Sequence, residues 1–369
     1  MKFICTQANI AKGLAQVVPV AGRNVQLPIL SHVLCEAKEG VLHLTATDLE
    51  NGIHTTVAGK VEREGSTTIP ARKVFEYIQQ VPGSHPLTLE RTDTRLTITT
   101  EGFKAQFPVN ESDEFPLLPT TKESAGVTLP ASQVCTALQG TAFAAAREET
   151  RPEIHSVYMV VTAREVRVAA TDSFRLAEAI IPLEAGESEH EFSVLLPLST
   201  AQEIVRLFSE EKEITLYPHE NQLIVNGADT ELTSRLGVGQ YPDYQQIIPT
   251  QFKVDGVVDT DALRRALKTV SIFLPRDSRR VHMLVNPGQE TLILKVEGSE
   301  AGAGEVTVPF EGEGEGLDIL FNAQYLLEGI QRIATPKCHV QCAGTSEPAL
   351  FRPTDTVQRF VYVVMPIQV

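Results

Sequence analysis

The stretches Ala46-Thr47-Asp48-Leu49 and Ala170-Thr171-Asp172-Ser173 decide the fold, because they place one Ala-Thr-Asp motif at two points 124 residues apart. Prolines repeat at nearly the same spacing, with Pro116, Pro242 and Pro366 separated by 126 and 124 residues. Solenoid repeats have periods of only about 20–50 residues. A period of this length is that of a whole domain, so the sequence predicts three copies of one domain. We expect the domains at residues 1–121, 126–249 and 252–369.

Each copy has the same predicted order of elements. A short strand (2–6, 126–129 and 256–258) precedes an amphipathic helix (9–18, 132–146 and 261–271). Ile10, Leu14 and Val17 share one side of the first of these helices, as a buried face requires. Alternating residues then predict strands at 41–46, 166–170 and 291–296, and second helices begin near Ala71, Ser199 and Asn322. Two helices and many strands in each copy predict an α+β fold.

The composition is that of a globular protein with several hydrophobic cores. The chain has 369 residues, of which 42% are hydrophobic, and no apolar run approaches the length of a membrane span. The first residues show no signal-peptide pattern, so we expect a cytoplasmic protein. Its five scattered cysteines favour reduced thiols over a disulfide framework. The net charge of −15 argues against a generally basic surface, but leaves room for a local positive field.

Catalytic motifs are missing from the sequence. It contains no P-loop, dinucleotide-binding glycine pattern or nucleophile elbow. Cys338, His339 and Cys342 have no second Cys/His pair at zinc spacing, so buried free thiols are the better interpretation. Asp48 and Asp172 each end a predicted strand, where aspartate usually bonds its own backbone in a turn. We therefore expect no catalytic residue, no metal and no cofactor.

An acidic run at residues 311–316 alternates glutamate with glycine. Its three glutamates would repel a phosphate, which excludes a phosphate-binding loop. We expect a solvated hairpin tip.

Taken in order, eight segments resemble the bacterial DNA polymerase III beta subunit family, the sliding clamps. Each segment is a weak match alone, but their order and spacing cover the whole chain. They are Leu27-Pro28-Ile29-Leu30, Ala46-Thr47-Asp48-Leu49-Glu50, Ile69-Pro70-Ala71-Arg72-Lys73, Glu114-Phe115-Pro116, Ala170-Thr171-Asp172-Ser173-Phe174-Arg175-Leu176-Ala177, Ser234-Arg235-Leu236, Tyr241-Pro242-Asp243-Tyr244 and Val363-Val364-Met365-Pro366-Ile367-Gln368-Val369.

The resemblance implies three DNA-clamp domains, each with two helices and two antiparallel sheets, that form half of a six-domain ring. Two chains would close head to tail around duplex DNA, with helices on the inner wall, in a heterologous contact whose rotation closes. Such a ring holds DNA by topology and needs no base readout. The implied role is that of a non-catalytic processivity factor for the replicative polymerase.

Basic residues on the helices of the implied inner wall would attract phosphates without reading sequence. The alternative for each of them is a solvated helix face. The DNA-binding residues expected from the helices and from one loop are Arg23, Lys12, Arg72, Lys73, Arg206, Arg264 and Lys268.

The resemblance also implies a hydrophobic pocket for short linear peptides that contain glutamine and leucine, with Phe or Leu near their end. Implied partners are the DNA polymerase III alpha subunit, the clamp loader, other DNA polymerases and mismatch-repair proteins. Ser173-Phe174 stands where the family often has Gly-His or Gly-Arg, which alters the expected pocket shape. For Leu176 and Val363 a core position is the alternative. The implied pocket residues are Ile154, Thr171, Ser173, Phe174, Arg175, Leu176, Pro242, Ile247, Val363, Met365, Pro366, Ile367 and Val369.

A homodimer seam is implied between the first domain of one chain and the third of the other. Lys104 and Phe107 match one side of this seam, and Ile272 and Phe273 fit the other side. Core burial is the competing interpretation of Ile272. A different class of protein also remains open, namely a repeat-built enzyme or ligand-binding protein with a small-molecule pocket between its units.

Overall fold

The computed structural model describes residues 1–22, 27–83, 85–118, 126–148, 150–183, 190–275, 278–299, 302–355 and 359–368. These residues fold into two compact units, unit 1 (1–132 and 206–236) and unit 2 (133–205 and 237–369). The α-helices of the described ranges are α1 Gln7–Val17, α2 Ala71–Gln80, α3 Ala131–Thr141, α4 Leu198–Phe208, α5 Thr260–Val270 and α6 Ala323–Ile330. Short 3-10 helices are η1 Pro28–Ser31, η2 Ser112–Glu114, η3 Ala142–Ala144, η4 Tyr244–Ile247, η5 Ser271–Phe273 and η6 Pro287–Gln289.

Unit 1 contains two antiparallel sheets. The five-stranded sheet has the order β5-β1-β7-β8-β9, and the eight-stranded sheet has the order β10-β15-β16-β17-β4-β3-β2-β6. Their strands are β1 Lys2–Cys5, β2 His32–Lys38, β3 Val41–Thr47, β4 Asn51–Val57, β5 Lys60–Arg63, β6 Gly65–Pro70, β7 Leu87–Thr92, β8 Arg95–Thr100, β9 Phe103–Pro108, β10 Val127–Pro130, β15 Glu213–His219, β16 Gln222–Asn226 and β17 Thr230–Arg235.

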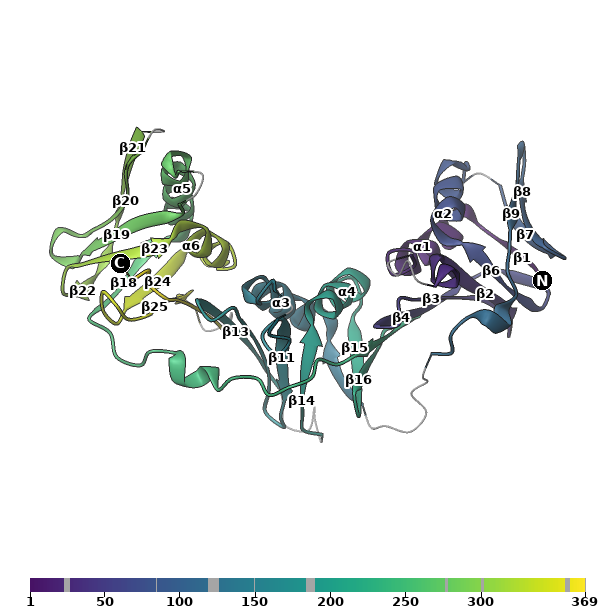
Figure 1. Ribbon diagram of the computed structural model, residues 1–369, viewed down its shortest axis with the longest axis horizontal. Helices are drawn as coiled ribbons and strands as arrows, with labels where there is room; N and C mark the ends of the chain where they lie inside the picture. Colours follow the sequence, from purple (N-terminus) through teal and green to yellow (C-terminus); the bar gives the residue numbers. More distant parts are fainter. Residues whose placement is uncertain are drawn as a thin grey trace. The chain divides into compact units, whose positions relative to one another are not determined.

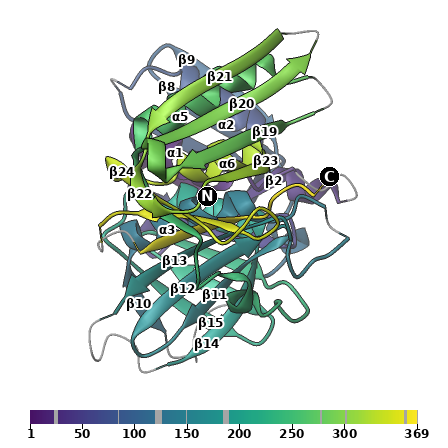
Figure 2. The ribbon, with the colours of Figure 1, turned by 90° about the vertical axis from the view of Figure 1, so that its left-hand side faces the viewer.

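Unit 2 contains two further antiparallel sheets. The nine-stranded sheet has the order β14-β11-β12-β13-β26-β25-β24-β18-β22, and the four-stranded sheet has the order β21-β20-β19-β23. Figure 2 shows β19, β20 and β21 side by side with α5 against them. The strands of these two sheets are β11 Ser156–Val161, β12 Glu165–Thr171, β13 Arg175–Pro182, β14 Phe192–Pro197, β18 Val254–Asp259, β19 Arg280–Asn286, β20 Thr291–Ser299, β21 Gly302–Pro309, β22 Glu311–Gly314, β23 Leu317–Asn322, β24 Lys337–Cys342, β25 Ala349–Pro353 and β26 Phe360–Val364.

Helix pairs cover the sheets with their apolar faces. In unit 1, α1 packs on β3 and β4 beside α2, and Ile10, Leu14 and Val17 of α1 are buried (Figure 1). The hydroxyl oxygen of Thr6 accepts a hydrogen bond from the Asn9 N–H at 3.2 Å and caps the start of α1. In unit 2, α5 packs beside α6 and against β20 and β21. Burial of one helix face against a sheet is what the 3.6-residue pattern predicts.

Two long sheets join the repeats to one another. In unit 1 the first copy's β4 pairs with the second copy's β17, with Ile53 opposite Leu232. In unit 2 the second copy's β13 pairs with the third copy's β26, with Leu176 opposite Val363. The same joint is therefore built twice, and each joint turns two small sheets into one continuous ladder of backbone hydrogen bonds.

Most predicted elements are confirmed; helix α4, for example, begins at Leu198, beside its predicted start near Ser199. Two details were wrong. The helix predicted at 132–146 ends at Thr141 and tightens into η3. The acidic run is not a hairpin tip, because β22 pairs with β18 as an edge strand. Glycine explains this pairing, since a Cβ on Gly312 would lie 2.6 Å from the Gly256 Cα.

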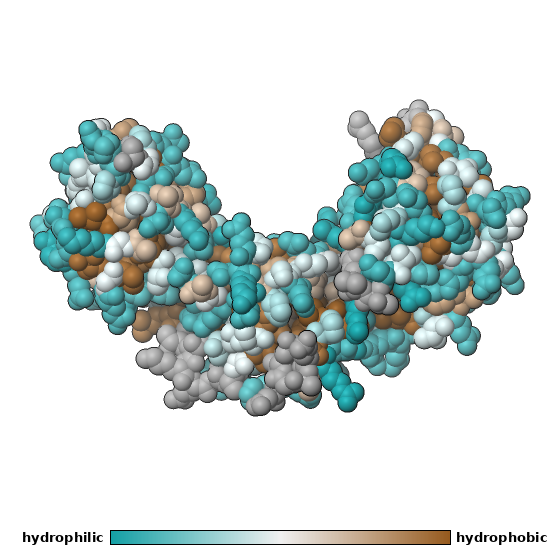
Figure 3. Space-filling model, turned by 180° about the vertical axis from the view of Figure 1, so that it is seen from behind, coloured by the Kyte–Doolittle hydropathy of each residue, from teal (hydrophilic) through white to brown (hydrophobic). Residues whose placement is uncertain are grey.

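The five cysteines are buried and free, as the sequence indicated. Burial raises the pKa of the Cys135 thiol to about 11, which keeps it protonated and unreactive at neutral pH. Hydrophilic residues cover most of the surface visible in Figure 3. Within the described ranges, no helix is long and apolar enough to cross a membrane.

Candidate functional site

The Ala-Thr-Asp motif of the second copy forms a tight turn between β12 and β13. The Thr171 hydroxyl donates to the Arg175 carbonyl oxygen at 2.6 Å and accepts from the Ser173 N–H at 3.1 Å. Asp172 Oδ1 accepts from the backbone N–H groups of Phe174 and Arg175, each at 3.0 Å. Ser173 has φ = +76°, in the left-handed region that L-residues rarely adopt. The turn leaves Phe174 62% exposed at its tip.

The first copy repeats this turn almost bond for bond. Asp48 Oδ1 accepts from the N–H groups of Glu50 and Asn51 at 3.1 and 2.7 Å. The Thr47 hydroxyl donates to the Asn51 carbonyl oxygen at 2.8 Å, and Leu49 also has φ = +76°. The interpretation of both repeated aspartates as turn residues is confirmed, because their carboxylates are engaged by their own backbone.

Arg175 is the most connected side chain at the turn. Its guanidinium is buried and forms ion pairs with Asp172 at 3.0 Å and with Glu328 on α6. It also donates to the Phe143 carbonyl oxygen at 2.8 Å, and its Cζ lies 4.3 Å from the centroid of the Tyr325 ring. Within unit 2, Arg175 thus links the turn between β12 and β13 to helix α6.

Burial disfavours the charged forms of Arg175 and Glu328, but the hydrogen bonds that these groups form have a larger effect on their pKa values. Burial alone would lower the pKa of Arg175, whereas the hydrogen bond to Glu328 raises that pKa above its ordinary value. For Glu328, burial would raise the carboxyl pKa, but hydrogen bonds from Arg175 and Gln324 hold the pKa below its ordinary value. Both groups therefore stay charged at neutral pH, and each depends on the other.

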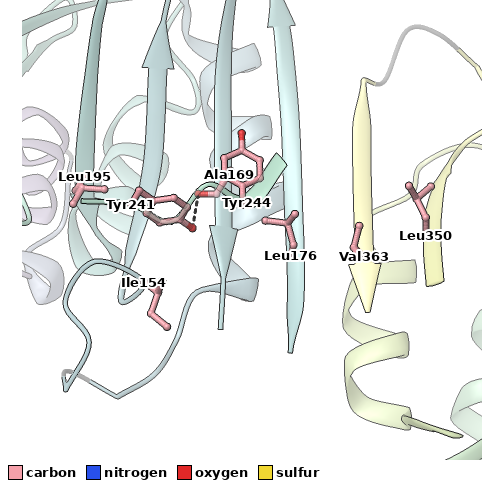
Figure 4. Close-up of a cluster of buried hydrophobic side chains, with 8 residues drawn as sticks. All are labelled: Ile154, Ala169, Leu176, Leu195, Tyr241, Tyr244, Leu350 and Val363. Atoms are coloured by element: carbon pink, nitrogen blue, oxygen red, sulfur yellow. Dashed lines mark hydrogen bonds between the residues drawn. The ribbon is translucent and has the colours of Figure 1, made fainter. Parts of the chain in front are cut away.

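An apolar cluster lies beside the turn and includes three predicted pocket residues, Ile154, Leu176 and Val363 (Figure 4). Leu176 and Val363 face each other across β13 and β26 and are only 2% and 1% exposed. Both side chains are therefore interior residues in this structure. The other members of the cluster are Ala169, Leu195, Tyr241, Tyr244 and Leu350.

The C-terminal segment follows β26 and is fixed by its backbone. The Met365 N–H donates to the Phe174 carbonyl oxygen at 2.8 Å, and the Ile367 N–H donates to the Leu320 carbonyl oxygen on β23 at 2.7 Å. Pro366 is buried, whereas the side chains of Met365 and Ile367 are half-buried. The predicted pocket residue Val369 lies outside the described residues.

A cavity of about 450 Å³ opens beside the turn. Ile154, Ser173, Phe174 and Arg175 line it, while Thr171 is buried within the turn itself. Pro242 and Ile247 come from the segment around η4, which contributes Tyr244 to the apolar cluster. Pro242 is half-buried and Ile247 is 44% exposed. The cavity is lined by Ala146, Arg147, Glu148, Thr150, Arg151, Ile154, Asp172, Ser173, Phe174, Arg175, Arg279, Gln324 and Tyr325.

The basic residues predicted to bind DNA fall into two structural groups. One group is exposed on helix surfaces: Lys12 on α1, Arg72 and Lys73 on α2, and Lys268 on α5. The position of Arg23 lies outside the described residues.

The second group binds the carbonyl groups that a helix leaves free at its C-terminal end. Arg206 donates to the Ala15 and Gln16 carbonyl oxygens of α1 at 3.1 and 2.6 Å. Arg264 donates to the Ile330 carbonyl oxygen of α6 at 3.2 Å and pairs with Asp261 at 2.8 Å. These two arginines have structural contacts that the sequence did not indicate.

The residues predicted for a seam lie at the edges of two sheets. Lys104 is exposed on the edge strand β9, and Phe107 is half-buried with its ring centroid 5.7 Å from that of Tyr77. Ile272 is 73% exposed, which argues against the core interpretation. Phe273 packs over the edge strand β21, where a Cβ on Gly304 would lie 2.3 Å from its ring.

Comparisons with known proteins agree over the whole chain. Models of the DNA polymerase III beta subunit match its N-terminal domain at residues 1–119, its central domain at 128–243 and its C-terminal domain at 245–368. A Beta sliding clamp of Synechococcus elongatus is 32% identical over 100% of this chain and 99% of the relative. That of Caulobacter vibrioides is 30% identical over 100% of both chains.

The chain belongs to the DNA polymerase III beta subunit family, the beta sliding clamps. Solved structures of sliding clamps agree with this assignment. The beta subunit of Pseudomonas aeruginosa has a TM-score of 0.93 at 25% identity and covers 100% of both chains. A clamp of the same organism bound to griselimycin has a TM-score of 0.94 at 25% identity, with the same coverage. Three clamp domains of α+β type make up this sliding clamp.

Several residues at the candidate site of this sliding clamp were missed by sequence reasoning. Tyr241 stacks on Tyr158 with ring centroids 4.8 Å apart, and the Tyr244 hydroxyl donates to Glu178 at 2.6 Å. Tyr325 and Arg279 line the cavity but come from the third domain. The pairing of β13 with β26 joins the second and third domains within unit 2. No local pattern in the sequence predicts that contact.

Proposed function

We propose that two copies of this sliding clamp close head to tail into a six-domain ring around duplex DNA and tether the replicative polymerase to its template. Family membership supports this proposal, and so does the threefold repeat of one fold. The three domains in this proposal have the boundaries expected from the sequence, namely residues 1–121, 126–249 and 252–369. The ring is a cytoplasmic, non-catalytic processivity factor, because a tether works by encircling DNA and needs no reacting group.

The observation that carries the proposal concerns two sheet edges. Within the described residues, β9 is a terminal strand of the five-stranded sheet and β21 is a terminal strand of the four-stranded sheet, so one side of each strand has no neighbouring strand. Pairing β9 of one copy with β21 of another would repeat the β4–β17 and β13–β26 joints between molecules. Lys104, Phe107, Ile272 and Phe273 lie on or beside these edges and would form the seam.

DNA contact in this proposal is electrostatic and independent of sequence. Exposed Lys12, Arg72, Lys73 and Lys268 would attract phosphates. Arg206 and Arg264 would contribute positive charge from fixed positions, because helix carbonyl oxygens hold their guanidinium groups. Together with Arg23, these basic residues would oppose the repulsion between DNA and a chain of net charge −15.

Partner proteins would bind with a short linear peptide at the apolar site of unit 2. Exposed Phe174 and Ile247, with half-buried Met365 and Ile367, offer apolar side chains within unit 2. Flexible methionine suits a socket that accepts several partners. The expected partners are the DNA polymerase III alpha subunit, the clamp loader, other DNA polymerases and mismatch-repair proteins. The full proposed pocket keeps Ile154, Thr171, Ser173, Phe174, Arg175, Leu176, Pro242, Ile247, Val363, Met365, Pro366, Ile367 and Val369.

The decisive experiment combines a solution mass with a topological test. The mass should be twice the chain mass of 40.4 kDa. After loading by a clamp loader, the protein should stay on a nicked circular plasmid and be lost when the plasmid is linearised. A monomer that never becomes retained on circular DNA, even with the loader, would refute the ring.

A further inference from the structure

Two histidines lie side by side on one face of the eight-stranded sheet of unit 1. Thr55 of β4 donates a hydrogen bond to Gln16 of α1 at 2.6 Å, so the preceding side chain, His54, points to the face opposite that helix. His54 lies opposite Thr45 of β3, and His43 is two residues before Thr45, on the same face. The histidines are 11 positions apart in sequence, which matches no zinc-binding spacing, so only the pairing of β3 with β4 brings them together.

The two imidazole rings are close enough to share one ligand. Nδ1 of His43 lies 3.2 Å from Nε2 of His54, and the ring centroids are 5.2 Å apart. Two nitrogens that bind one tetrahedral zinc ion, each at about 2.0–2.1 Å, lie about 3.3 Å from one another. The distance between the two histidine nitrogens therefore suits two ligands of one metal ion, with only small rotations of the rings.

Thr45 holds His54 in the orientation that metal binding needs. The Oγ1 atom of Thr45 lies 3.0 Å from Nδ1 of His54, and Thr45 is itself buried. In the tautomer that donates from Nδ1 to this oxygen, the lone pair of the His54 Nε2 atom faces His43. A hydrogen bond at the far ring nitrogen is how proteins usually fix a metal-binding histidine.

Hydrogen bonding alone leaves this histidine pair incompletely satisfied. Nε2 of His43 is buried, and within the described residues it has no hydrogen-bond partner. Buried nitrogens without a partner are uncommon in proteins and call for a functional explanation. The pair thus has a ring orientation fixed by Thr45 and a binding capacity that the protein's own groups do not use up.

The surroundings favour neutral rings and a bound cation. Burial lowers the pKa of both His43 and His54, so both rings are neutral at neutral pH, which is the form that binds metals. The carboxylates of Glu36 and Glu39 act electrostatically on His43, against the ammonium group of Lys38. Two negative groups and one positive group leave a local field that attracts a cation.

We propose that His43 and His54 bind one divalent late transition-metal ion, with Zn²⁺ as the representative, on the face of unit 1 opposite α1. Imidazole nitrogens suit zinc, copper and nickel. Within the described residues, no group of three or more His, Cys, Asp or Glu side chains is placed to hold a metal, so water completes the coordination. The bound ion ties β3 to β4 beside the β4–β17 joint and thereby stabilises the folded protein.

The test uses the full-length protein without a histidine tag. Isothermal titration calorimetry with zinc chloride at about pH 7 measures affinity and stoichiometry, and thermal unfolding is followed with and without zinc. We expect one ion per chain and a rise in Tm that a chelator reverses. Electron paramagnetic resonance with one equivalent of Cu²⁺ counts the coordinating nitrogens, and we expect two from imidazole.

Single variants assign the ion to this pair. His43→Gln and His54→Gln should each lower the zinc affinity by more than about tenfold and abolish the rise in Tm. Thr45→Val keeps the shape of the side chain but removes its hydroxyl, and it should weaken binding by about tenfold. His219→Gln is the matched control and should bind zinc as the wild type does, because His219 is an exposed histidine at the end of β15 in the same sheet.

The possible outcomes decide the proposal whether or not every variant folds. Circular dichroism without zinc establishes which variants are folded. Zinc affinity that is unchanged in the folded histidine variants would place the ion elsewhere and refute the site. If neither histidine variant folds, the copper spectrum of the wild type decides, since fewer than two coordinating nitrogens would overturn the proposal. None of these results depends on the proposed ring or on the proposed peptide pocket.

Discussion

Met365 lies directly after β26, and its backbone is bound to the turn while its side chain remains half-buried. Met365→Ala removes the thioether but keeps the N–H that donates to Phe174. We expect a peptide containing glutamine and leucine to bind about tenfold more weakly, because a lost apolar contact of this size is worth about 1–2 kcal/mol. The mass in solution should not change. An unaltered affinity would remove Met365 from the proposed pocket.

Glu328 makes stability depend on pH in a defined direction. Its folded pKa lies below the ordinary value of 4.5, so the unfolded chain binds more protons at this group in mild acid. The contribution of Glu328 to the free energy of unfolding is therefore fully present above the ordinary carboxyl pKa. It is lost as the pH falls through the folded pKa.

Urea unfolding of wild type and Glu328→Gln between about pH 3 and about pH 7 measures this contribution. We expect wild type to be the more stable protein at neutral pH and the difference to shrink in acid. Glu210→Gln, at an exposed position just after α4, serves as the control for the loss of one carboxylate. A difference that stays constant with pH would contradict the proposed coupling between Glu328 and Arg175.

At the scale of the element, Arg206 in the last turn of α4 contacts the C-terminal end of α1 within unit 1. Arg206→Ala leaves the Ala15 and Gln16 carbonyl oxygens to water and removes the favourable charge at that helix end. We expect a loss of about 1 kcal/mol in the free energy of unfolding. Lys12→Ala on the exposed face of α1 should cost much less. Equal stabilities of the two variants would show that the Arg206 contact is not stabilising.

The sequence predicted the elements with strong local patterns and missed those that depend on distant contacts. The turns around Asp48 and Asp172 were predictable, because aspartate after a strand bonds its own backbone. Strand β22 was not, since alternating Gly and Glu is typical of a loop until β18 supplies a partner. Within the site, the Arg175–Glu328 pair joins residues 153 positions apart, a contact that no local periodicity encodes.

At the scale of the whole molecule, a single charge introduced at the proposed seam tests whether that seam is the dimer interface. Ile272 is 73% exposed, so Ile272→Glu should leave the fold intact. In the proposed ring it would put a carboxylate into an apolar interface, and we expect a shift from dimer to monomer by analytical ultracentrifugation. Val238→Glu is the control, because Val238 is 69% exposed and lies outside the proposed seam. If both variants stay dimeric, Ile272 does not lie in the interface.

The β4–β17 and β13–β26 joints also determine which fragments of this chain can be expressed without an exposed sheet edge. An excised middle domain would carry β17 and β13 with bare edges, each a template for unwanted association between molecules. The repeat in the sequence and the compact unit of the structure therefore have different boundaries in this protein. Hydrogen exchange should protect each long sheet as one block, and protein fragments should be cut to keep a whole sheet and not a whole repeat.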